Sequence, residues 1–554
     1  MKVTIAQINT INGDIDGNVA RILSAIDQAK AEGSDLVVFP ELVTHGYTSQ
    51  DWFEDPDIIE HSLEPLERII PATEGIAVVV GTIRPNTDND GRRIYNCAAV
   101  LADGELLGFV DKTLLPEYDV FDDPRWFEPN HAARRLFEIK GVKVGVVVCE
   151  DFWNDETFWK DRLYDKDPAD EVIDMGAELV VSINASPYNK GKIRLRCDMV
   201  AHRAKARSVP IVFVNLIGGN DGIIFDGASL VADEEGDIIL QAAAFREFVE
   251  TVELDCRKPD ARGITGGEVE SIRSALVLGI RDYARKNGFG RAVLGLSGGI
   301  DSSLVAALAS EAIGPENLLC VMMPSPFSSD GSIIDSHELV RNLGCETRIE
   351  PISGSFEVLL RQLKLHEPTK SGDSLAAENM QSRLRGLILM AISNSEGRLL
   401  LSTGNKSELA VGYCTLYGDT NGGLAVLGDV LKTEVWEIAR EINRHAEREI
   451  IPKRIIEKKP SAELAPNQLD QDSLPPYEVM DPILKMYFEQ KASPAEIIAA
   501  GNDSERVYWI LNKVEHPANE FKRQQLPPTL IISKNAIGIG RRRPITHKYR
   551  RQAG

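Results

Sequence analysis

Residues 294–303 read LGLSGGIDSS, and this stretch constrains the architecture of the chain more than any other. The apolar residues 292–294 predict the end of a buried strand, a Ser-Gly-Gly turn follows, and Asp301 opens a helical pattern. The backbone amides of such a turn, two hydroxyl groups and a helix N-terminus together form a site for phosphate oxygens. Because no lysine follows the second glycine, this is not the Gly-x-x-x-x-Gly-Lys-Ser/Thr loop of kinases and GTPases. The stretch therefore predicts an α/β nucleotide-binding domain of another kind.

The loop at residues 296–303, LSGGIDSS, resembles the SGGxDS loop of the N-type ATP pyrophosphatases. That resemblance implies that the loop holds the pyrophosphate end of ATP while an acceptor is adenylylated. An ordinary strand-to-helix turn is the alternative, and the Ser-Gly-Gly part alone would favour it. The acidic residue and the two serines that follow favour the nucleotide site. The expected ATP contacts in the loop are Leu296, Ser297, Gly298, Gly299, Ile300, Asp301, Ser302 and Ser303.

The composition is typical of folded domains and argues against a large anionic partner. The 554 residues suggest two or more domains, and 43% hydrophobic with 26% charged residues fit a folded chain. The net charge of −22 at pH 7 argues against a nucleic-acid backbone as the main partner, although nucleotides can still bind in local basic and glycine-rich pockets. The basic run Arg541–Arg543 is a local exception, which we expect to be a solvated tail.

Cysteine usage and the absence of long apolar segments favour the cytoplasm. The seven cysteines are scattered without a CxxC pair, which suggests reduced thiols rather than a zinc site or a disulfide framework. The start, MKVTIAQINT, lacks the apolar core and the cleavage site of a signal peptide. No apolar stretch approaches the roughly 20 residues needed to span a membrane. We therefore expect a cytoplasmic protein whose partners include neither membranes nor nucleic acids.

Alternating strand and helix patterns divide the chain into two α/β domains. In the first half, short Val/Ile runs predict strands covered on both faces, and Asn18 is expected to cap a helix that ends near Gly33. Residues 256–270 contain Pro, Gly and charge and are expected to link the domains 1–255 and 271–554. The strands expected in the first domain are 3–8, 36–39, 76–80, 97–101, 142–148, 179–183 and 211–214.

Three residues of the first half form a workable amidase set. Glu41 and Cys149 each stand at the end of a Val-rich strand, where the ligands of α/β sheets collect, and Lys112 lies between them in sequence. Glu41 can take the thiol proton, and Cys149 can attack an amide carbon to form a thioester and release ammonia. Lys112 can favour the thiolate and stabilise the oxyanion. Taken singly, Cys149 would be a small buried hydrophobe, and the other two would be solvated or paired with each other.

In this order and setting, the three residues resemble the Glu-Lys-Cys triad of the nitrilase, or carbon–nitrogen hydrolase, superfamily. The resemblance spans about residues 1–250 and implies a four-layer αββα fold. The fragments 115–123, LPEYDVFDD, and 184–192, NASPYNKGK, look like glutamine-binding segments of the amidotransferase members. The glutamine contacts that this implies are Tyr118, Glu150, Ser186 and Lys192.

Two nearby features receive no role. The block 218–229, GGNDGIIFDGAS, resembles the same subgroup, but Asn220 and Gly222 stand where a Gln and a Glu are expected. Glu117 is a candidate for a second catalytic carboxylate. A solvated loop glutamate is the alternative for Glu117, and we favour that alternative.

The second half adds fragments that a generic ATP site would lack. Thr403 directly follows a predicted strand, and Glu408 lies on the next predicted helix. Another helix carries Arg383 and Arg385, which are available for anionic groups. Asp301 and Glu408 are expected to share a magnesium ion that bridges ATP phosphates, because this hard cation prefers oxygen ligands.

Over about residues 270–545, these runs resemble the glutamine-dependent NAD synthetase family, and the nitrilase-like half strengthens the match. The resemblance implies a Rossmann-like, doubly wound parallel sheet of the adenine nucleotide alpha hydrolase type for this domain. The family converts deamido-NAD, ATP, glutamine and water to NAD, AMP, pyrophosphate and glutamate. Besides the loop, the contacts that this resemblance implies are Thr403, Lys432 and Ser461 to ATP, and Asn379, Glu408 and Lys522 to deamido-NAD.

The resemblance implies a ligase with two sites. Cys149 releases ammonia from glutamine, while in the second domain the nicotinate carboxylate of deamido-NAD attacks the α-phosphorus of ATP. Ammonia then displaces AMP from the acyl-adenylate. The family further implies a protected tunnel for ammonia and a homo-oligomer that pairs through the synthetase domain. Glu408 is therefore expected to contact both magnesium and the dinucleotide, and the sequence does not separate these two roles.

Two other functions stay open at this point. One is a different ATP-pyrophosphatase amidotransferase ligase, such as a GMP or asparagine synthetase, although those carry differently built glutaminase domains. The other is an amide or nitrile hydrolase fused to a nucleotide-sensing module. The motif settings of Thr403, Lys432 and Glu408 argue for a working ATP site and against the second alternative.

Overall fold

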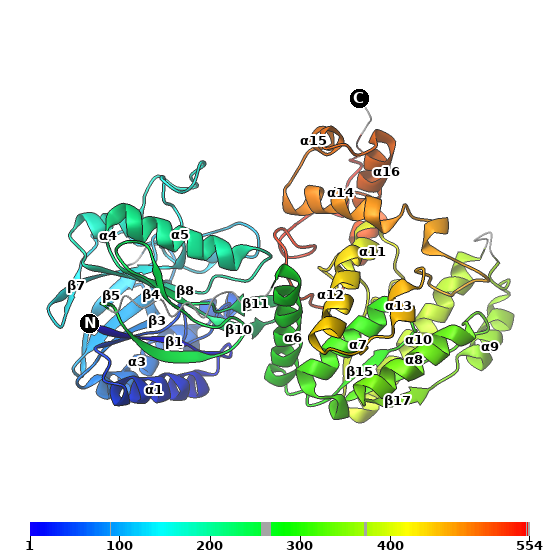
Figure 1. Cartoon of the computed structure of the whole chain (residues 1–554), viewed down its shortest axis with the longest axis horizontal. Coiled ribbons are helices and arrows are strands. Elements are labelled where there is room, and N and C mark those ends of the chain that lie inside the picture. Colours follow the sequence, from blue (N-terminus) through cyan, green and yellow to red (C-terminus); the bar gives the residue numbers. More distant parts are fainter. Residues whose placement is uncertain (89, 256–266, 370–373, 550, 552–554) are drawn as a thin grey trace. The chain divides into compact units, whose positions relative to one another are not determined.

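The chain folds into two compact units, Met1–Thr265 and Gly266–Gly554 (Figure 1). The computed structural model describes residues 1–88, 90–255, 267–369, 374–549 and 551. Most of the linker expected at 256–270 lies outside the described residues. The first helix of the second unit, α6 (Glu268–Lys286), already begins within the last residues of that stretch.

Two six-stranded sheets form the centre of the first unit. The first has the strand order β14-β1-β2-β3-β4-β5, and the second has the order β13-β12-β9-β8-β7-β6. The central strands β1, β2 and β3 run parallel, as do β7, β8 and β9. The bounds are β1 (Lys2–Gln7), β2 (Leu36–Val38), β3 (Ala77–Pro85), β4 (Ile94–Ala102), β5 (Glu105–Asp111), β6 (Phe137–Ile139), β7 (Val142–Val148), β8 (Leu179–Asn184), β9 (Ile211–Asn215), β12 (Leu230–Ala232), β13 (Ile238–Gln241) and β14 (Phe248–Glu253), with β10 (Ile217–Asn220) and β11 (Ile223–Asp226) as a separate pair.

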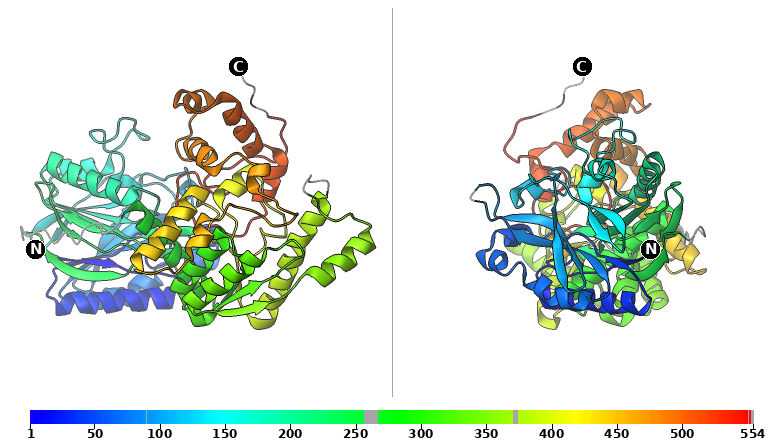
Figure 2. Two further views of the ribbon diagram at one scale, coloured as in Figure 1. Left: turned by 45° about the vertical axis from the view of Figure 1, so that its right-hand side comes forward. Right: turned by 90° about the vertical axis from the view of Figure 1, so that its left-hand side faces the viewer.

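Helices cover the outer face of each sheet, so the unit has four layers in the order α-β-β-α (Figures 1 and 2). Val and Ile side chains of both sheets fill the space between them, which explains why the central strands are apolar without alternation. This is the αββα sandwich that the nitrilase resemblance predicted. The helices of the unit are α1 (Ile15–Ala31), α2 (Pro56–Glu60), α3 (Glu64–Ile69), α4 (Pro168–Asp174) and α5 (Lys192–Arg207).

The start of α1 differs from the expectation. Asp14, not Asn18, caps this helix and accepts a hydrogen bond from the Gly17 amide. Asn18 lies inside the first turn, where its buried side chain donates to the carbonyl groups of Ile11 and Thr44. Asp and Asn are both favoured at helix N-caps, so the sequence pattern alone does not show which of Asp14 and Asn18 caps the helix.

A five-stranded parallel sheet forms the base of the second unit, in the order β17-β16-β15-β18-β19. The chain builds one side of the sheet outward from β15 and then crosses to build the other side from β18. The predicted doubly wound sheet is therefore confirmed, and the strand order reverses between β15 and β18. Ligands of such sheets bind at the carboxyl ends of the strands at this switch point. The bounds are β15 (Ala292–Gly295), β16 (Leu318–Met322), β17 (Glu346–Ile349), β18 (Leu399–Ser402) and β19 (Leu424–Ala425).

Helices surround this sheet, and one group of them packs into a separate apolar cluster. That cluster joins α11 to α14 and α16, and Figure 1 shows α14, α15 and α16 above the sheet. The helices after α6 are α7 (Ile300–Ile313), α8 (Asp330–Leu343), α9 (Ser353–Leu363), α10 (Leu375–Glu396), α11 (Lys406–Val411), α12 (Lys432–His445), α13 (Lys453–Glu457), α14 (Tyr477–Glu489), α15 (Pro494–Ala499), α16 (Ser504–Val514) and α17 (Pro517–Arg523).

Within the basic run near the C-terminus, Arg542 and Arg543 are exposed as expected, but Arg541 is not. The guanidinium of Arg541 lies 2.6 Å from Glu515 Oε1 and stands over the rings of Tyr487 and Phe488. The Glu515 carboxylate is buried and attracts this arginine from a distant part of the sequence. An acidic partner that directly follows α16 cannot be recognised from the run itself.

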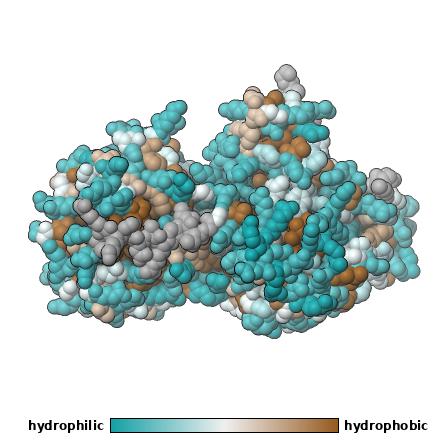
Figure 3. Space-filling model, in the orientation of Figure 1, coloured by the Kyte–Doolittle hydropathy of each residue, from teal (hydrophilic) through white to brown (hydrophobic). Residues whose placement is uncertain are grey.

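The face shown in Figure 3 is largely hydrophilic, with scattered apolar residues. Across residues 1–88, 90–255, 267–369, 374–549 and 551, no helix has both the length and the apolar character needed to cross a membrane.

Candidate active sites

The structure brings Glu41 and Lys112 into direct contact inside the first unit. Lys112 directly follows β5, and its Nζ atom donates to Glu41 Oε1 at 2.7 Å. Both side chains are 0% exposed. Cys149 directly follows β7 and is 3% exposed. The predicted triad residues therefore follow the carboxyl ends of β2, the edge strand β5 and β7, and Glu41 and Lys112 are paired at rest.

A second carboxylate, Asp123, shares the same ammonium group. Lys112 Nζ lies 2.7 Å from Asp123 Oδ2, and the Tyr47 hydroxyl donates to Asp123 Oδ1 at 3.0 Å. Burial disfavours the ammonium ion, but Asp123 and Glu41 together hold the pKa of Lys112 well above its ordinary value. Lys112 is thus a fixed cation between two acids, and the sequence predicted only one of them.

Glu41 is held by both of its oxygens. The Asn96 amide donates to Oε1 at 2.7 Å, and the backbone amide of Ala185 donates to Oε2 at 2.9 Å. These contacts come from β4 and from the segment after β8, so the carboxylate is fixed by both sheets of the sandwich. A base with so few orientations needs little rearrangement to accept a proton.

Cys149 occupies a strained backbone conformation, with φ at 48°, at the turn from β7 into the 3-10 helix Cys149–Phe152. Burial, supported by the nearby Glu41 charge, raises the pKa of the Cys149 thiol well above its ordinary value, while Lys112 acts in the opposite direction. The thiol is therefore protonated at rest, and nucleophilic attack requires a base. The charge of Glu41 acts on this thiol, so Glu41 remains the candidate base.

The candidate glutamine contacts lie on three segments around Cys149. The Tyr118 hydroxyl donates to both oxygens of Glu150, at 2.9 and 3.0 Å. Lys192 Nζ lies 5.3 Å from the centre of the Trp153 ring, and burial lowers the pKa of Lys192 to about 8. Ser186 is buried, and its hydroxyl accepts a 3.4 Å hydrogen bond from an arginine of α5.

Glu117, which we considered as a second catalytic carboxylate, is exposed and belongs to the loop before Tyr118. The buried carboxylate beside Lys112 is Asp123 instead. The fragment LPEYDVFDD contains four acidic residues, and nothing in its pattern marks the last one as the buried one.

In the second unit, the SGGIDSS loop connects β15 to α7 at the switch point of the sheet. Gly298 has φ at +75°, and a Cβ atom there would lie 2.4 Å from the Ser332 carbonyl oxygen, so only glycine fits without strain. The Ser297 and Ser302 hydroxyls lie 3.0 Å apart, and the Ser303 hydroxyl donates to the Gly299 carbonyl. The loop is a tight turn with its hydroxyls and amides next to a helix N-terminus, as a phosphate site requires.

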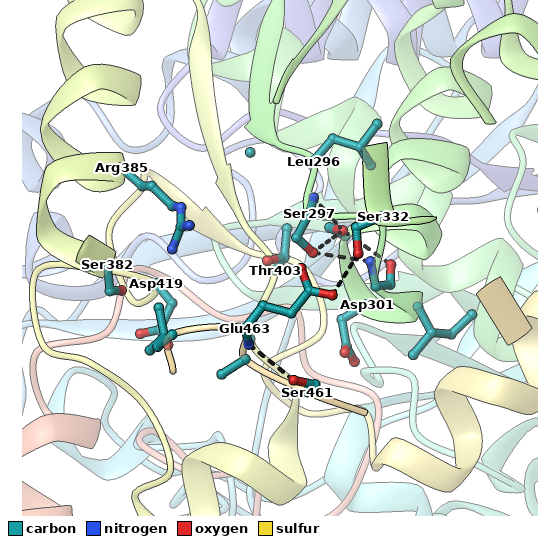
Figure 4. A pocket seen from close by; sticks show the side chains of 18 of the residues that line it. Leu296, Ser297, Asp301, Ser332, Ser382, Arg385, Thr403, Asp419, Ser461 and Glu463 are labelled. Carbon is teal, nitrogen blue, oxygen red and sulfur yellow. Dashed lines mark hydrogen bonds between the residues drawn. The ribbon is translucent and has the colours of Figure 1, made fainter. Parts of the chain in front are cut away.

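A cavity of about 290 Å³ opens at this loop. Its walls come from the ends of β15, β16 and β18 and from the segment 458–464 (Figure 4). In Figure 4, Ser297, Asp301 and Thr403 lie on one side and Arg385 on the other. The expected ATP contacts that line the cavity are Leu296, Ser297, Gly299, Ile300, Asp301, Ser302, Thr403, Lys432 and Ser461.

Asp301 and Glu408 meet at one cation in this cavity. Lys432 Nζ lies 2.5 Å from Asp301 Oδ2 and 3.2 Å from Glu408 Oε1. Burial raises the pKa of Glu408 to about 8 against the effect of Lys432, and the charges of Asp301 and Asp470 act in the same direction as burial. Within the described part of the chain, no group of three or more acidic, His or Cys side chains is placed to hold a metal ion.

Three further residues, predicted as ATP or deamido-NAD contacts, form hydrogen bonds within the protein. The Ser461 hydroxyl donates to the Gln468 carbonyl at 2.5 Å within its own loop. The Asn379 side chain accepts a hydrogen bond from Thr415, and Lys522 Nζ donates to the carbonyl groups of Gly412 and Cys414. The residues that line the cavity include Ser461 but neither Asn379 nor Lys522.

Comparison with known proteins matches each unit to a family. A family model described as carbon-nitrogen hydrolase matches residues 2–258, and one described as NAD synthase matches residues 272–526. Two curated relatives, from Synechocystis and Thermotoga maritima, are both named glutamine-dependent NAD(+) synthetase. They are 45% and 39% identical to this chain, and each comparison covers 99% of both proteins. The solved structure of glutamine-dependent NAD+ synthetase from Acinetobacter baumannii in complex with ADP is 38% identical, covers 98% of each chain and has a TM-score of 0.77.

Proposed function

The chain belongs to the glutamine-dependent NAD(+) synthetase family, and from this membership we propose that each unit carries one half of a single reaction. The protein is a ligase that converts deamido-NAD, ATP, glutamine and water to NAD, AMP, pyrophosphate and glutamate. The strongest support for dividing the reaction between the two units is that each unit has its own buried set of charged residues. One set surrounds Cys149, and the other lies beside the SGGIDSS loop.

In the first unit, Cys149 is the proposed nucleophile toward the side-chain amide of glutamine. Glu41 accepts the thiol proton as sulfur bonds to the amide carbon, and Lys112 stabilises the oxyanion of the tetrahedral intermediate. The proton then passes to the departing nitrogen, so that ammonia leaves and a thioester remains. Water, activated by Glu41, hydrolyses the thioester to glutamate and restores the thiol.

The proposed glutamine contacts divide between the two charged groups of the amino acid. Glu150 is suited to the α-amino group, because its carboxylate is oriented by the Tyr118 hydroxyl. Lys192 is suited to the α-carboxylate, and Ser186 can donate a hydrogen bond beside it. These roles rest on the positions of the side chains around Cys149 and on the family resemblance.

In the second unit, the nicotinate carboxylate of deamido-NAD attacks the α-phosphorus of ATP, and pyrophosphate departs. We propose that residues 296–303, Thr403, Lys432 and Ser461 hold ATP. Ammonia then attacks the acyl carbon, loses a proton and displaces AMP. The proposed contacts to deamido-NAD are Asn379, Glu408 and Lys522.

Magnesium is the cofactor of this reaction, and Asp301 and Glu408 are the residues that would hold it. They fit a hard cation because their oxygens already share the Lys432 ammonium group. When bound, the ion neutralises phosphate charge and so supports departure of pyrophosphate. Lys432 then remains available to the phosphates themselves.

Product analysis tests the proposed function. Purified protein is incubated with glutamine, ATP, magnesium and deamido-NAD, and the nucleotides are separated by chromatography. We expect NAD, AMP and pyrophosphate in equal amounts. Formation of ADP in place of AMP, or the absence of NAD, would contradict the proposed function.

We also propose that the protein works in the cytoplasm as a homo-oligomer of at least two copies. The six cysteines in the described part of the chain are free thiols, which fits a reducing compartment. Pairing through the second unit is carried over from the family. Light scattering of the purified protein gives its oligomeric state, and a monomer at micromolar concentration would contradict pairing.

A further inference from the structure

Four consecutive side chains at the start of α11 contact four different segments of the second unit. The first three are fully buried, and the fourth, Glu408, lines the nucleotide cavity. Such a short helix does not gain its position from its own hydrogen bonds, so these contacts determine where Glu408 lies. The contacts are Asn405 with Asp301, Lys406 with Ser533, Ser407 with Asp481, and Glu408 with Lys432.

Asn405 is the member of this group that contacts both proposed magnesium ligands. Its Oδ1 atom accepts a hydrogen bond from the Glu408 backbone amide at 3.0 Å, which caps the helix. Its Nδ2 atom donates to Asp301 Oδ1 at 2.9 Å. The other Asp301 oxygen, Oδ2, contacts Lys432, which also reaches Glu408. Asn405, Asp301, Lys432 and Glu408 therefore form a closed ring.

We propose that Asn405 is a positioning residue that sets the two carboxylates relative to each other for a divalent cation and the ATP phosphates. The proposal rests on the proposed function of this cavity. A carboxylate with one oxygen held by an amide has a fixed orientation, and here the second oxygen of Asp301 contacts Lys432. Asn405 combines two roles, because the acceptor atom caps the helix and the donor atom orients Asp301.

These two roles can be separated by substitution. Serine and threonine also cap helices through a side-chain oxygen, so Asn405→Ser keeps the cap. A serine has no second polar atom that extends toward Asp301. The substitution adds no charge, so any loss of cation binding reflects the orientation of Asp301 rather than a change in electrostatic attraction.

Ser533→Ala is the matched control. Ser533 is 2% exposed, contacts Lys406 beside Asn405, and donates to Asp429. It belongs to the same buried network but touches none of the residues in the ring. The Ser533→Ala variant therefore shows how much the loss of a buried hydrogen bond outside the ring affects cation binding.

The experiment measures binding of Mn²⁺ by electron paramagnetic resonance in the presence of α,β-methylene-ATP, together with the melting temperature. We expect Asn405→Ser to weaken Mn²⁺ binding about 10-fold, the size expected for one hydrogen bond to a charged group. NAD synthesis from ammonium salts should fall by a similar factor, while Ser533→Ala stays within about twofold in both measurements. If Asn405→Ser does not fold, Asn405→Thr keeps a capping oxygen and is measured in the same way.

The proposal is wrong if Mn²⁺ binding by the serine or threonine variant stays within about twofold of the unaltered protein. It is also wrong if Ser533→Ala weakens binding as much as Asn405→Ser does. Failure of the proposed function has a different signature, because the unaltered protein would then form no NAD. The Mn²⁺ measurements compare variants without relying on turnover.

Discussion

Asp123 is predicted to support glutamine hydrolysis through Lys112, and the variant Asp123→Asn tests this. In the structure, Asp123 Oδ2 accepts from Lys112 and Oδ1 accepts from the Tyr47 hydroxyl. An asparagine of the same shape retains only one acceptor oxygen and no charge. The fully buried ammonium group then depends on Glu41 alone, which is also the proposed base.

The expected loss is the value of one hydrogen bond between charged groups, about 1.5–3 kcal/mol. That range corresponds to a roughly 10- to 150-fold fall in kcat/KM for glutamine-dependent NAD synthesis. Synthesis from ammonium salts uses only the second unit and should stay within about twofold of the unaltered rate. Initial rates with each nitrogen source provide the comparison.

The matched control is Glu117→Gln, which neutralises an exposed carboxylate six positions before Asp123 in the same loop. We expect this variant to retain full activity with either nitrogen source. The reasoning is refuted if Asp123→Asn leaves the glutamine-dependent rate unchanged. It is equally refuted if Glu117→Gln lowers that rate as much as Asp123→Asn.

Other predictions concern the loop and the glutamine site. Asp301→Ala should stop NAD synthesis with either nitrogen source, and retained ammonium-dependent turnover would remove Asp301 from its proposed role. Gly298→Ala should reduce ammonium-dependent synthesis more than about 10-fold, because the new Cβ atom would lie 2.4 Å from the Ser332 carbonyl oxygen; an ATP affinity equal to that of the unaltered protein would contradict this. Since burial lowers the pKa of Lys192 to about 8, its ammonium ion is lost as the pH rises through that value. The KM for glutamine should therefore increase between about pH 7 and pH 9, and a flat KM profile would contradict the proposed contact with the carboxylate.

The main architecture could be predicted because both sheets are built from central strands with strong local signals. Val142–Val148 and Leu179–Asn184 consist mainly of Val, Leu and Ile, and polar residues at or after their ends stand at the site. Strands with mixed burial, such as β5 and β14, were not expected, because their pattern resembles that of loops. Their positions depend on pairing with strands that are distant in sequence.

Contacts that depend on distant segments also limited the prediction of the sites. Glu41 was identified at a predicted strand end and Lys112 from the nitrilase-like triad, but their direct pairing and the second acid, Asp123, depend on how the loop after β5 folds back. In the same way, Asn405 appears in the sequence as an ordinary helix cap. Its contact with Asp301 joins residues 104 positions apart and exists only in the folded unit.

The central claim is that one unit makes ammonia and the other consumes it. Cys149→Ala, assayed for NAD formation with glutamine and with ammonium salts, tests this claim most directly. The account predicts that NAD synthesis from glutamine is abolished and that synthesis from ammonium stays within about twofold of the unaltered protein. Loss of both activities in a variant with an unchanged melting temperature, or retention of glutamine-dependent synthesis, would contradict it.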